Sequence, residues 1–518
     1  MSDIKRKVGT FTDEELKELE RVYIEDGTGK KTVAGLGSGI ACIVGEFLKG
    51  PVNVPTLVTT DDDIESIFGT WSIYSNPGFE NLTGSIDPSL SEDITEGNGY
   101  FRVKNAKYAS LYILRVDDSV ATCTLTLSGT ATAMVFPAGI QFSDADESNI
   151  FATCQDYTIA TTDYVAGEYV IEDVPLRRVK GTSLTPTLTK CLDQDNFLTS
   201  LRVATTILDI TPSDLSTVED LDLDLIEARY AAAIDALGEE DPDIKEISIT
   251  VSCRHTPVIL QALKADAVDA QVNNAIGRIA IVAPVVGTLK ADAWDDDDAT
   301  VCVGNANVSR SDAVVFAWPG HKEYFRELAG TYDVSSDYVI ASEISQTAPE
   351  ESIGQKTTRL TYVSGVETAN KSLKTPDYIQ MKARGICGIR MNKSLGPQIQ
   401  SSITSVNPLL DPTLVTIQRR RMSTFISGSL ANFAANFKSK KYNVSNYNDL
   451  CLGVYSFLSN LKTGERIEDF ACDFRTGNTP TRTAQGIVTL IVEVRTLAAM
   501  DYIVFKTSIG ETVEITVS

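Results

Sequence analysis

Histidine is almost absent from this chain of 518 residues, which contains only His255 and His321. Any histidine-dependent catalytic triad would therefore have to use one of these two residues. The sequence also lacks the GxSxG, HExxH and GxxxxGK[ST] patterns, which supply nucleophiles, zinc ligands and phosphate-binding loops. These absences make an enzyme the least favoured class of protein, and no catalytic residue is predicted.

Long apolar runs are missing too, since none approaches the ~20 residues that a membrane-spanning helix needs. The longest candidates, such as residues 279–287, have the length of a strand. Residues 1–20 are charged and lack the apolar core of a secretory signal. We therefore expect no membrane insertion, and a chain that is made and folded in a cytoplasm.

The nine cysteines include no CxxC pair, which argues against a zinc ribbon or a thioredoxin-type redox site. Two interpretations remain open. The cysteines could all be small buried hydrophobic side chains, or some could form disulfides between copies of the chain outside a reducing compartment. The candidates for such inter-subunit disulfides are Cys42, Cys123, Cys154, Cys191, Cys253, Cys302, Cys387, Cys451 and Cys472.

No cofactor or metal site is predicted. The glycines of residues 34–40 miss the spacing of a dinucleotide fingerprint, and a strand follows them where a helix should begin. The acidic runs Asp61–Asp63 and Asp295–Asp298 lack the alternating ligands of a calcium loop. We interpret neither acidic run as a metal site, only as solvated turns. Thr60, just before the first run, can cap a short helix whose first turn contains the acidic residues, where the helix dipole favours them.

Charge is unevenly distributed along a chain whose formal net charge is -24. Residues 381–441 contain one acidic residue, Asp411, and ten basic ones: Lys382, Arg384, Arg390, Lys393, Arg419, Arg420, Arg421, Lys438, Lys440 and Lys441. Residues 209–243, in contrast, contain twelve acidic residues and one basic residue, Arg229. The basic segment could bind an acidic protein, a nucleic acid or an acidic face of the next copy, or it could simply be solvated.

Hydrophobic periodicity predicts the main elements. Thr12 and Glu15 form a capping box, which predicts a short amphipathic helix over residues 11–23. Strand and helix patterns alternate over residues 246–378 and predict a sheet with helices packed on it, with residues 323–332 as one of the helices. Two long helices are predicted over residues 413–437 and 448–464.

Two sets of motifs, near the ends of the chain, resemble those of contractile-tail sheath proteins of phages and related contractile injection systems. The N-terminal set is Val44-Gly45-Glu46-Phe47, Gly50-Pro51, Val54-Pro55, Val58-Thr59-Thr60, Phe68-Gly69 and Arg115-Val116. The C-terminal set is Arg420-Arg421, Phe437, Gly464, Cys472-Asp473, Asn478-Thr479-Pro480 and Gly486, with Pro319-Gly320 before it. Their order over most of the chain outside residues 117–245 makes the resemblance specific.

The resemblance and the patterns together predict an α+β multidomain fold. A mixed α/β core domain comprises residues 32–116 and 189–378, and an all-β domain over residues 117–188 is inserted into it. A C-terminal α/β domain that faces a tube comprises residues 379–505. Arms at residues 1–31 and 506–518 would add strands to neighbouring copies, because a terminal strand can pair with a free sheet edge.

The resemblance implies a structural subunit that forms stacked hexameric rings around an inner tube and contracts to drive that tube through a cell envelope. The implied partners are other copies of the chain, the inner tail tube protein, and baseplate and tail terminator proteins, without direct nucleic-acid binding. The implied location is a virion tail assembled in a bacterial cytoplasm. Candidate contacts to an acidic tube are Arg419, Arg420, Arg421, Lys438, Lys440 and Lys441. The alternative is a surface or adhesion protein that does not contract and binds glycans through its β insertion.

Overall fold

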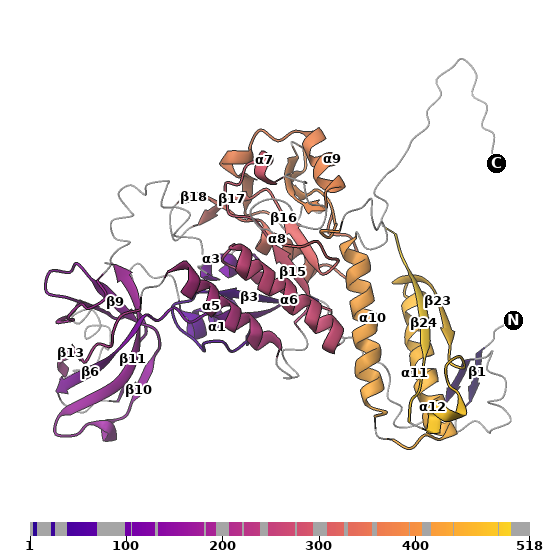
Figure 1. Cartoon of the computed structure of the whole chain (residues 1–518), viewed down its shortest axis with the longest axis horizontal. Coiled ribbons are helices and arrows are strands. Elements are labelled where there is room, and N and C mark those ends of the chain that lie inside the picture. Colours follow the sequence, from indigo (N-terminus) through magenta and orange to yellow (C-terminus); the bar gives the residue numbers. More distant parts are fainter. Residues whose placement is uncertain are drawn as a thin grey trace, which may run out of the picture. The chain divides into compact units, whose positions relative to one another are not determined.

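The computed structural model describes residues 4–7, 22–25, 39–69, 99–104, 106–129, 133–180, 183–192, 207–219, 222–238, 247–274, 277–293, 308–325, 330–354, 360–392, 394–406, 416–438, 440–484 and 486–498 (Figure 1). The chain divides into two compact units. Unit 1 comprises Met1–Val33, Glu350–Ser352 and Phe433–Ser518, and unit 2 comprises Ala34–Pro349 and Ile353–Asn432. The predicted C-terminal domain begins at residue 379, so its first part lies in unit 2.

A seven-stranded sheet organises unit 2, in the order β20-β16-β15-β14-β3-β5-β4. Neighbouring strands are parallel, except that β4 is antiparallel to β5. The strands are β3 (Ile40–Gly45), β4 (Thr56–Val58), β5 (Ser110–Arg115), β14 (Ile249–Ser252), β15 (Ile279–Val282), β16 (Val314–Ala317) and β20 (Ile386–Cys387). This arrangement confirms the predicted sheet with helices packed on it.

The sheet separates two hydrophobic cores, because successive side chains of a strand point to opposite faces. Ala41 and Ile43 of β3 belong to the core that contains α8 (Asp337–Gln346). Cys42 and Val44 belong to the core that contains α5 (Leu223–Asp235) and α6 (Pro257–Asn274). Burial on both faces explains why the strand is continuously apolar and could be predicted from the sequence.

The N-terminal motifs shape the first loop and helix of unit 2. The Oγ1 atom of Thr60 accepts a hydrogen bond from Asp63 N at 3.1 Å, and the Asp63 carboxylate accepts one from Thr60 N at 2.9 Å. This capping box starts α1 (Asp61–Phe68), as predicted, and α3 (Gly99–Lys104) precedes β5. Gly50 has a φ of 111°, and a Cβ atom there would lie 2.7 Å from the Phe68 ring. Only glycine fits this turn.

An antiparallel sheet with its own core is formed by strands between residues 121 and 213. Its order is β12-β8-β9-β11-β6-β13, and β7 pairs separately with β10. The strands are β6 (Ala121–Gly129), β7 (Met134–Phe136), β8 (Gln141–Ser143), β9 (Ile150–Thr153), β10 (Tyr157–Ile159), β11 (Glu168–Lys180), β12 (Lys190–Cys191) and β13 (Ile207–Ser213). The last two lie beyond residue 188, where the predicted insertion ends. The division into domains remains a prediction.

The helix predicted over residues 323–332 is wrong. The chain instead forms β17 (His321–Phe325) and β18 (Gly330–Val334), which pair antiparallel, and β19 (Val363–Val366) pairs with β17; residues 326–329 lie outside the described part. In β17 the side chains of His321, Glu323 and Phe325 are buried, whereas Tyr324 is exposed. This period of two is the strand pattern, and it overrides the helix-like composition.

The remaining α-helices and β-strands of unit 2 lie after β15 in sequence. They are α7 (Lys290–Ala293), α9 (Thr375–Ala383), the hairpin of β21 (Ile389–Asn392) and β22 (Gly396–Ile399), and most of α10 (Ile417–Ala435). The helix predicted over residues 413–437 is confirmed from Ile417 to Ala435.

Unit 1 contains α11 (Val444–Thr463), which ends at Gly464 as predicted, and α12 (Pro480–Ala484). Its strands are β23 (Ile467–Asp473), antiparallel to β24 (Ile491–Thr496), and β1 (Ile4–Lys7), parallel to β2 (Val22–Glu25). Residues 22 and 23 are therefore strand and not the end of the predicted helix. The rest of that predicted helix lies outside the described residues.

Candidate functional site

Two of the predicted tube contacts, Arg420 and Arg421, belong to α10 and are buried. The Nη1 atom of Arg420 lies 2.8 Å from Asp312 Oδ2, and Arg421 donates hydrogen bonds to the carbonyl oxygens of Thr347, at 2.7 Å, and Ala348, at 3.1 Å. Burial lowers the pKa of Arg420, although Asp312 opposes this shift. These arginines hold α10 against the body of unit 2, and the third arginine, Arg419, is half-buried.

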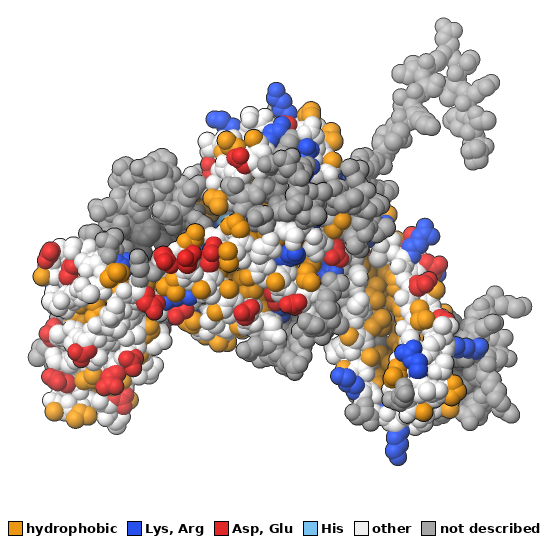
Figure 2. All heavy atoms as spheres, in the orientation of Figure 1, with side chains coloured by type: hydrophobic (Ala, Val, Ile, Leu, Met, Phe, Trp, Pro, Cys, Tyr) orange, Lys and Arg blue, Asp and Glu red, His pale blue; other side chains and the backbone are white. Residues whose placement is uncertain are grey.

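Lys438, Lys440 and Lys441, in contrast, are exposed between α10 and α11. The Nζ atom of Lys440 lies 4.4 Å from the centroid of the Phe437 ring, a cation–π distance. Tyr442 is also exposed, at 51% of its surface. Figure 2 shows Lys and Arg side chains projecting near the connection between these helices. The exposed positive charge of the predicted contact set therefore lies mainly in this loop.

The β23–β24 pair of unit 1 offers two open edges. Among the described residues, β23 and β24 pair only with each other. Asn478 ties the intervening loop together, since its side chain donates to Phe474 O at 2.8 Å and accepts from Thr489 N at 2.7 Å. An isolated two-stranded sheet is marginally stable, and its edges accept further strands. The predicted C-terminal strand, residues 506–518, lies outside the described residues.

The cysteines of the described part are free, and six of them are buried: Cys42, Cys123, Cys154, Cys253, Cys387 and Cys451. Burial raises the pKa of the Cys42, Cys253 and Cys387 thiols to about 12, which suppresses the reactive thiolate. Cys191 and Cys472 are half-buried, and Cys302 lies outside the described residues. The structure thus favours the interpretation of buried hydrophobic side chains for the six.

We expect alkylation of the native chain to modify Cys191 and Cys472 at least about 100-fold faster than the six buried cysteines, because a buried thiol is inaccessible and rarely ionised. Mass spectrometry of peptides after timed iodoacetamide treatment would measure this. Any disulfide ladder of intact particles on non-reducing gels should therefore disappear when serine replaces Cys191, Cys302 and Cys472. A ladder that persists in this variant would contradict the expectation.

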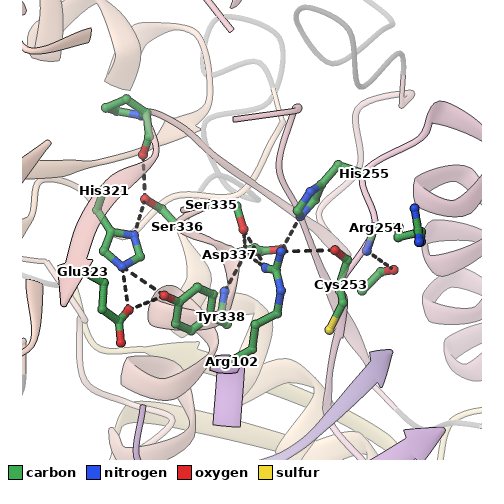
Figure 3. Close-up of polar contacts among 12 residues, drawn as sticks. Arg102, Cys253, Arg254, His255, His321, Glu323, Ser335, Ser336, Asp337 and Tyr338 are labelled. Carbon is green, nitrogen blue, oxygen red and sulfur yellow. Dashed lines mark hydrogen bonds and ion pairs between the residues drawn. The ribbon is translucent and has the colours of Figure 1, made fainter. Parts of the chain in front are cut away.

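Both histidines lie in a buried polar cluster at the N-terminal end of α8 (Figure 3). The Nε2 atom of His255 is 2.9 Å from Asp337 Oδ2, and the Nη1 atom of Arg102 is 3.2 Å from Asp337 Oδ1. Arg102 also donates to Cys253 O at 3.1 Å. Burial alone would raise the pKa of Asp337, but Arg102 and His255 together hold it well below its usual value.

The second histidine superficially resembles part of a catalytic triad. The Nε2 atom of His321 lies 3.1 Å from Glu323 Oε2, and its Nδ1 atom lies 3.5 Å from Ser336 Oγ. The Ser336 hydroxyl instead donates to Pro319 O at 2.6 Å, and Tyr338 donates to the Glu323 carboxylate. All of these side chains are buried, so no substrate can reach the serine. The cluster fixes α8 against β17 and against the segment that follows β14.

The described residues contain no group of three or more His, Cys, Asp or Glu side chains placed to hold a metal ion. Of the acidic runs in the sequence, Asp61–Asp63 belongs to the cap of α1, and Asp295–Asp298 lies outside the described residues. No helix in the described part is long and apolar enough to cross a membrane.

Comparison with known proteins identifies the fold. No family model and no curated protein matches the sequence. A chain of the contracted helical sheath of the anti-feeding prophage has a TM-score of 0.54 and 11% identity, over 93% of this chain and 97% of that chain. A chain of the 6-fold symmetrised baseplate of the same prophage has a TM-score of 0.52 and 12% identity, over 93% and 96% of the two chains. The chain therefore has the fold of contractile sheath proteins, as its motifs predict.

Proposed function

We propose that this chain is the structural subunit of a contractile sheath, which stacks as hexameric rings around an inner tube and contracts to drive the tube through a cell envelope. The observation that carries the proposal is the fold, which corresponds over 93% of this chain to a chain of a contracted helical sheath. The partners are other copies of this chain, an inner tube, a baseplate and a tail terminator. The role is structural, in a tail assembled in a bacterial cytoplasm.

The open edges of β23 and β24 support this function, because a sheath must stay connected while its subunits move. Strand addition supplies main-chain hydrogen bonds that survive rotation of the bodies. The arm of one copy would pair with the β23–β24 pair of the next. Subunit bodies held by polar, charged contacts can then exchange one packing for another during contraction.

Sedimentation tests the proposal. The purified full chain should pellet as polymers much larger than a single hexamer, and the pelleted fraction should rise with protein concentration. Chains that stay monomeric at all protein and salt concentrations would contradict the proposal.

The tube contact is proposed to use the exposed cations at 438–441 rather than the buried Arg420 and Arg421. Replacing Lys438 and Lys441 by Glu should weaken co-sedimentation with tube purified from the same particle by about tenfold at low salt, and less at high salt, because exposed charges are screened. Lys440 stays unchanged, since it contacts Phe437. Titration of sheath against fixed tube gives the affinity.

A matched control replaces Lys462 and Arg482 by Glu, which changes the net charge equally at two exposed positions of unit 1. This control should bind the tube like the original chain. If both double substitutions weaken tube binding equally, the effect is due to net charge. If replacing Lys438 and Lys441 does not weaken tube binding at any salt concentration, the proposed tube contact is contradicted.

A further inference from the structure

Exposed lysines and apolar side chains gather around α7 and α9 of unit 2 (Figures 1 and 2). Leu289 is 54% exposed and Ile379 is 65% exposed. The Nζ atom of Lys290 lies 2.5 Å from Asp377 Oδ1, and this ion pair joins α7 to α9. We define the α9 face as Leu289, Lys290, Lys371, Lys374 and Ile379.

Lysines outnumber carboxylates around the α9 face, where Lys290, Lys371 and Lys374 lie near Asp377 and the exposed Asp292 of α7. The pKa of Asp377 is lowered chiefly by the hydrogen bond from Lys290, and the charge of Lys374 lowers it further. Lys371 and Lys374 are exposed, and neither forms a salt bridge within the part of the chain that the structure describes. Their charges are therefore available to an acidic partner, and Ile379 and Leu289 provide apolar area beside them.

The exposed side of α5 is complementary. Asp224, Ala228, Ala232 and Asp235 are exposed along one side of the helix, because their spacings of four, four and three residues align. We define these four residues as the α5 face. Figure 2 shows Asp and Glu side chains over this helix.

The negative charge of the α5 face is not neutralised locally. Arg229, the only basic residue of α5, is already occupied: it lies 2.6 Å from Glu219 Oε2 and also donates to backbone carbonyls. Asp224 and Asp235 form no salt bridge with any described residue. The small side chains of Ala228 and Ala232 leave room between the two carboxylates for an apolar side chain of a partner.

We infer that the α9 face of one copy docks on the α5 face of a second copy of this chain. Lys371 and Lys374 would then face Asp224 and Asp235, while Ile379 lies over Ala228 and Ala232. Because the two faces differ, the contact is head-to-tail, and repetition extends it into a ring or a helical row. The inference rests on the proposed function, in which many copies repeat the contact.

A second copy fits the α9 face better than nucleic acid does. Nucleic acid requires an extended basic stripe, whereas this face has apolar side chains between a few lysines, on a chain of net charge -24. Exposed ion pairs contribute little each. A weak contact repeated in every subunit suits a lattice that must break and reform its body contacts.

A charge exchange tests the contact in the full chain. Lys371→Glu with Lys374→Glu should raise the protein concentration needed for half of the chain to pellet by about tenfold at low salt, because like charges then face each other. Asp224→Lys with Asp235→Lys should have a similar effect. Combining all four substitutions in one chain should return the concentration to within about threefold of the original, since the attraction is restored with exchanged signs.

Lys107→Glu with Lys190→Glu is the matched control, because it changes the net charge equally at exposed positions outside both faces. The inference would be overturned if the original chain forms tubes but the variant with all four substitutions polymerises no better than either variant with two. That result would leave the sheath proposal intact. If the variant with all four substitutions regains polymerisation but the polymers are not tubes, this would support the contact between the two faces and contradict the sheath proposal. Chains that never associate would contradict both.

Discussion

Replacing Asp337 by alanine is expected to lower the free energy of unfolding by about 3–5 kcal/mol, because the substitution leaves a buried charge without its partner. The Asp337 side chain is 1% exposed and joins Arg102 to His255. Arginine cannot release its proton in a protein, so Arg102 would remain charged in the core. Urea unfolding of the monomeric chain, followed by tryptophan fluorescence, measures the loss, since Trp318 is buried in the same unit.

Asp61→Ala is the matched control, because Asp61 forms an exposed ion pair with Lys107 at 3.0 Å. Exposed pairs contribute ~0–1 kcal/mol, so the control should change little. An equal effect of the two substitutions would contradict the importance of the cluster.

Acid stability gives an independent readout of Asp337. Its pKa in the folded chain is lower than its ordinary value of 3.8. The unfolded chain therefore binds this proton more readily. The contribution of Asp337 to stability is complete above the ordinary pKa and is lost as the pH falls through the lower folded value. We expect the original chain to lose stability below about pH 4, and the alanine variant to lose less over the same range.

Blocking the terminal strand is expected to abolish polymerisation while leaving the monomer folded. Proline at Val513 and Ile515 removes two backbone donors from the predicted strand and prevents its pairing with a sheet edge. The pelleted fraction should fall at least about tenfold, because strand addition is the proposed link between copies. Circular dichroism should stay unchanged.

The control for this variant exchanges the two residues conservatively, with Val513→Ile and Ile515→Val. It keeps both backbone donors and should polymerise like the original chain. Full polymerisation of the proline variant would contradict the proposed role of the C-terminal arm.

Local patterns predicted the elements that depend on neighbours in sequence. The cap at Thr60, the buried strand at residues 40–45 and the helices α10 and α11 follow from spacing alone. The helix predicted over residues 323–332 is wrong because the alternating burial of β17, which has the period of two of a strand, outweighs the helix-forming composition of this segment. The alternation from His321 to Phe325 was a signal in the sequence that could have corrected it.

Burial of charged residues was harder to predict. Arg420 and Arg421 follow the buried Ile417 by three and four residues. The helical period therefore places them on the same side of α10 as Ile417, and this spacing could have signalled their burial. The cluster at α8 had no such signal. His255 and Asp337 are 82 residues apart, and only the packing of α8 against the sheet brings them together. The sequence therefore identified both histidines but not their shared role.

Negative-stain electron microscopy of the purified full chain tests the sheath proposal most directly. The proposal predicts hollow tubes built of stacked rings with six-fold symmetry. Monodisperse monomers across protein and salt concentrations would contradict it, and would favour a surface or adhesion protein that binds through its β-sheet region.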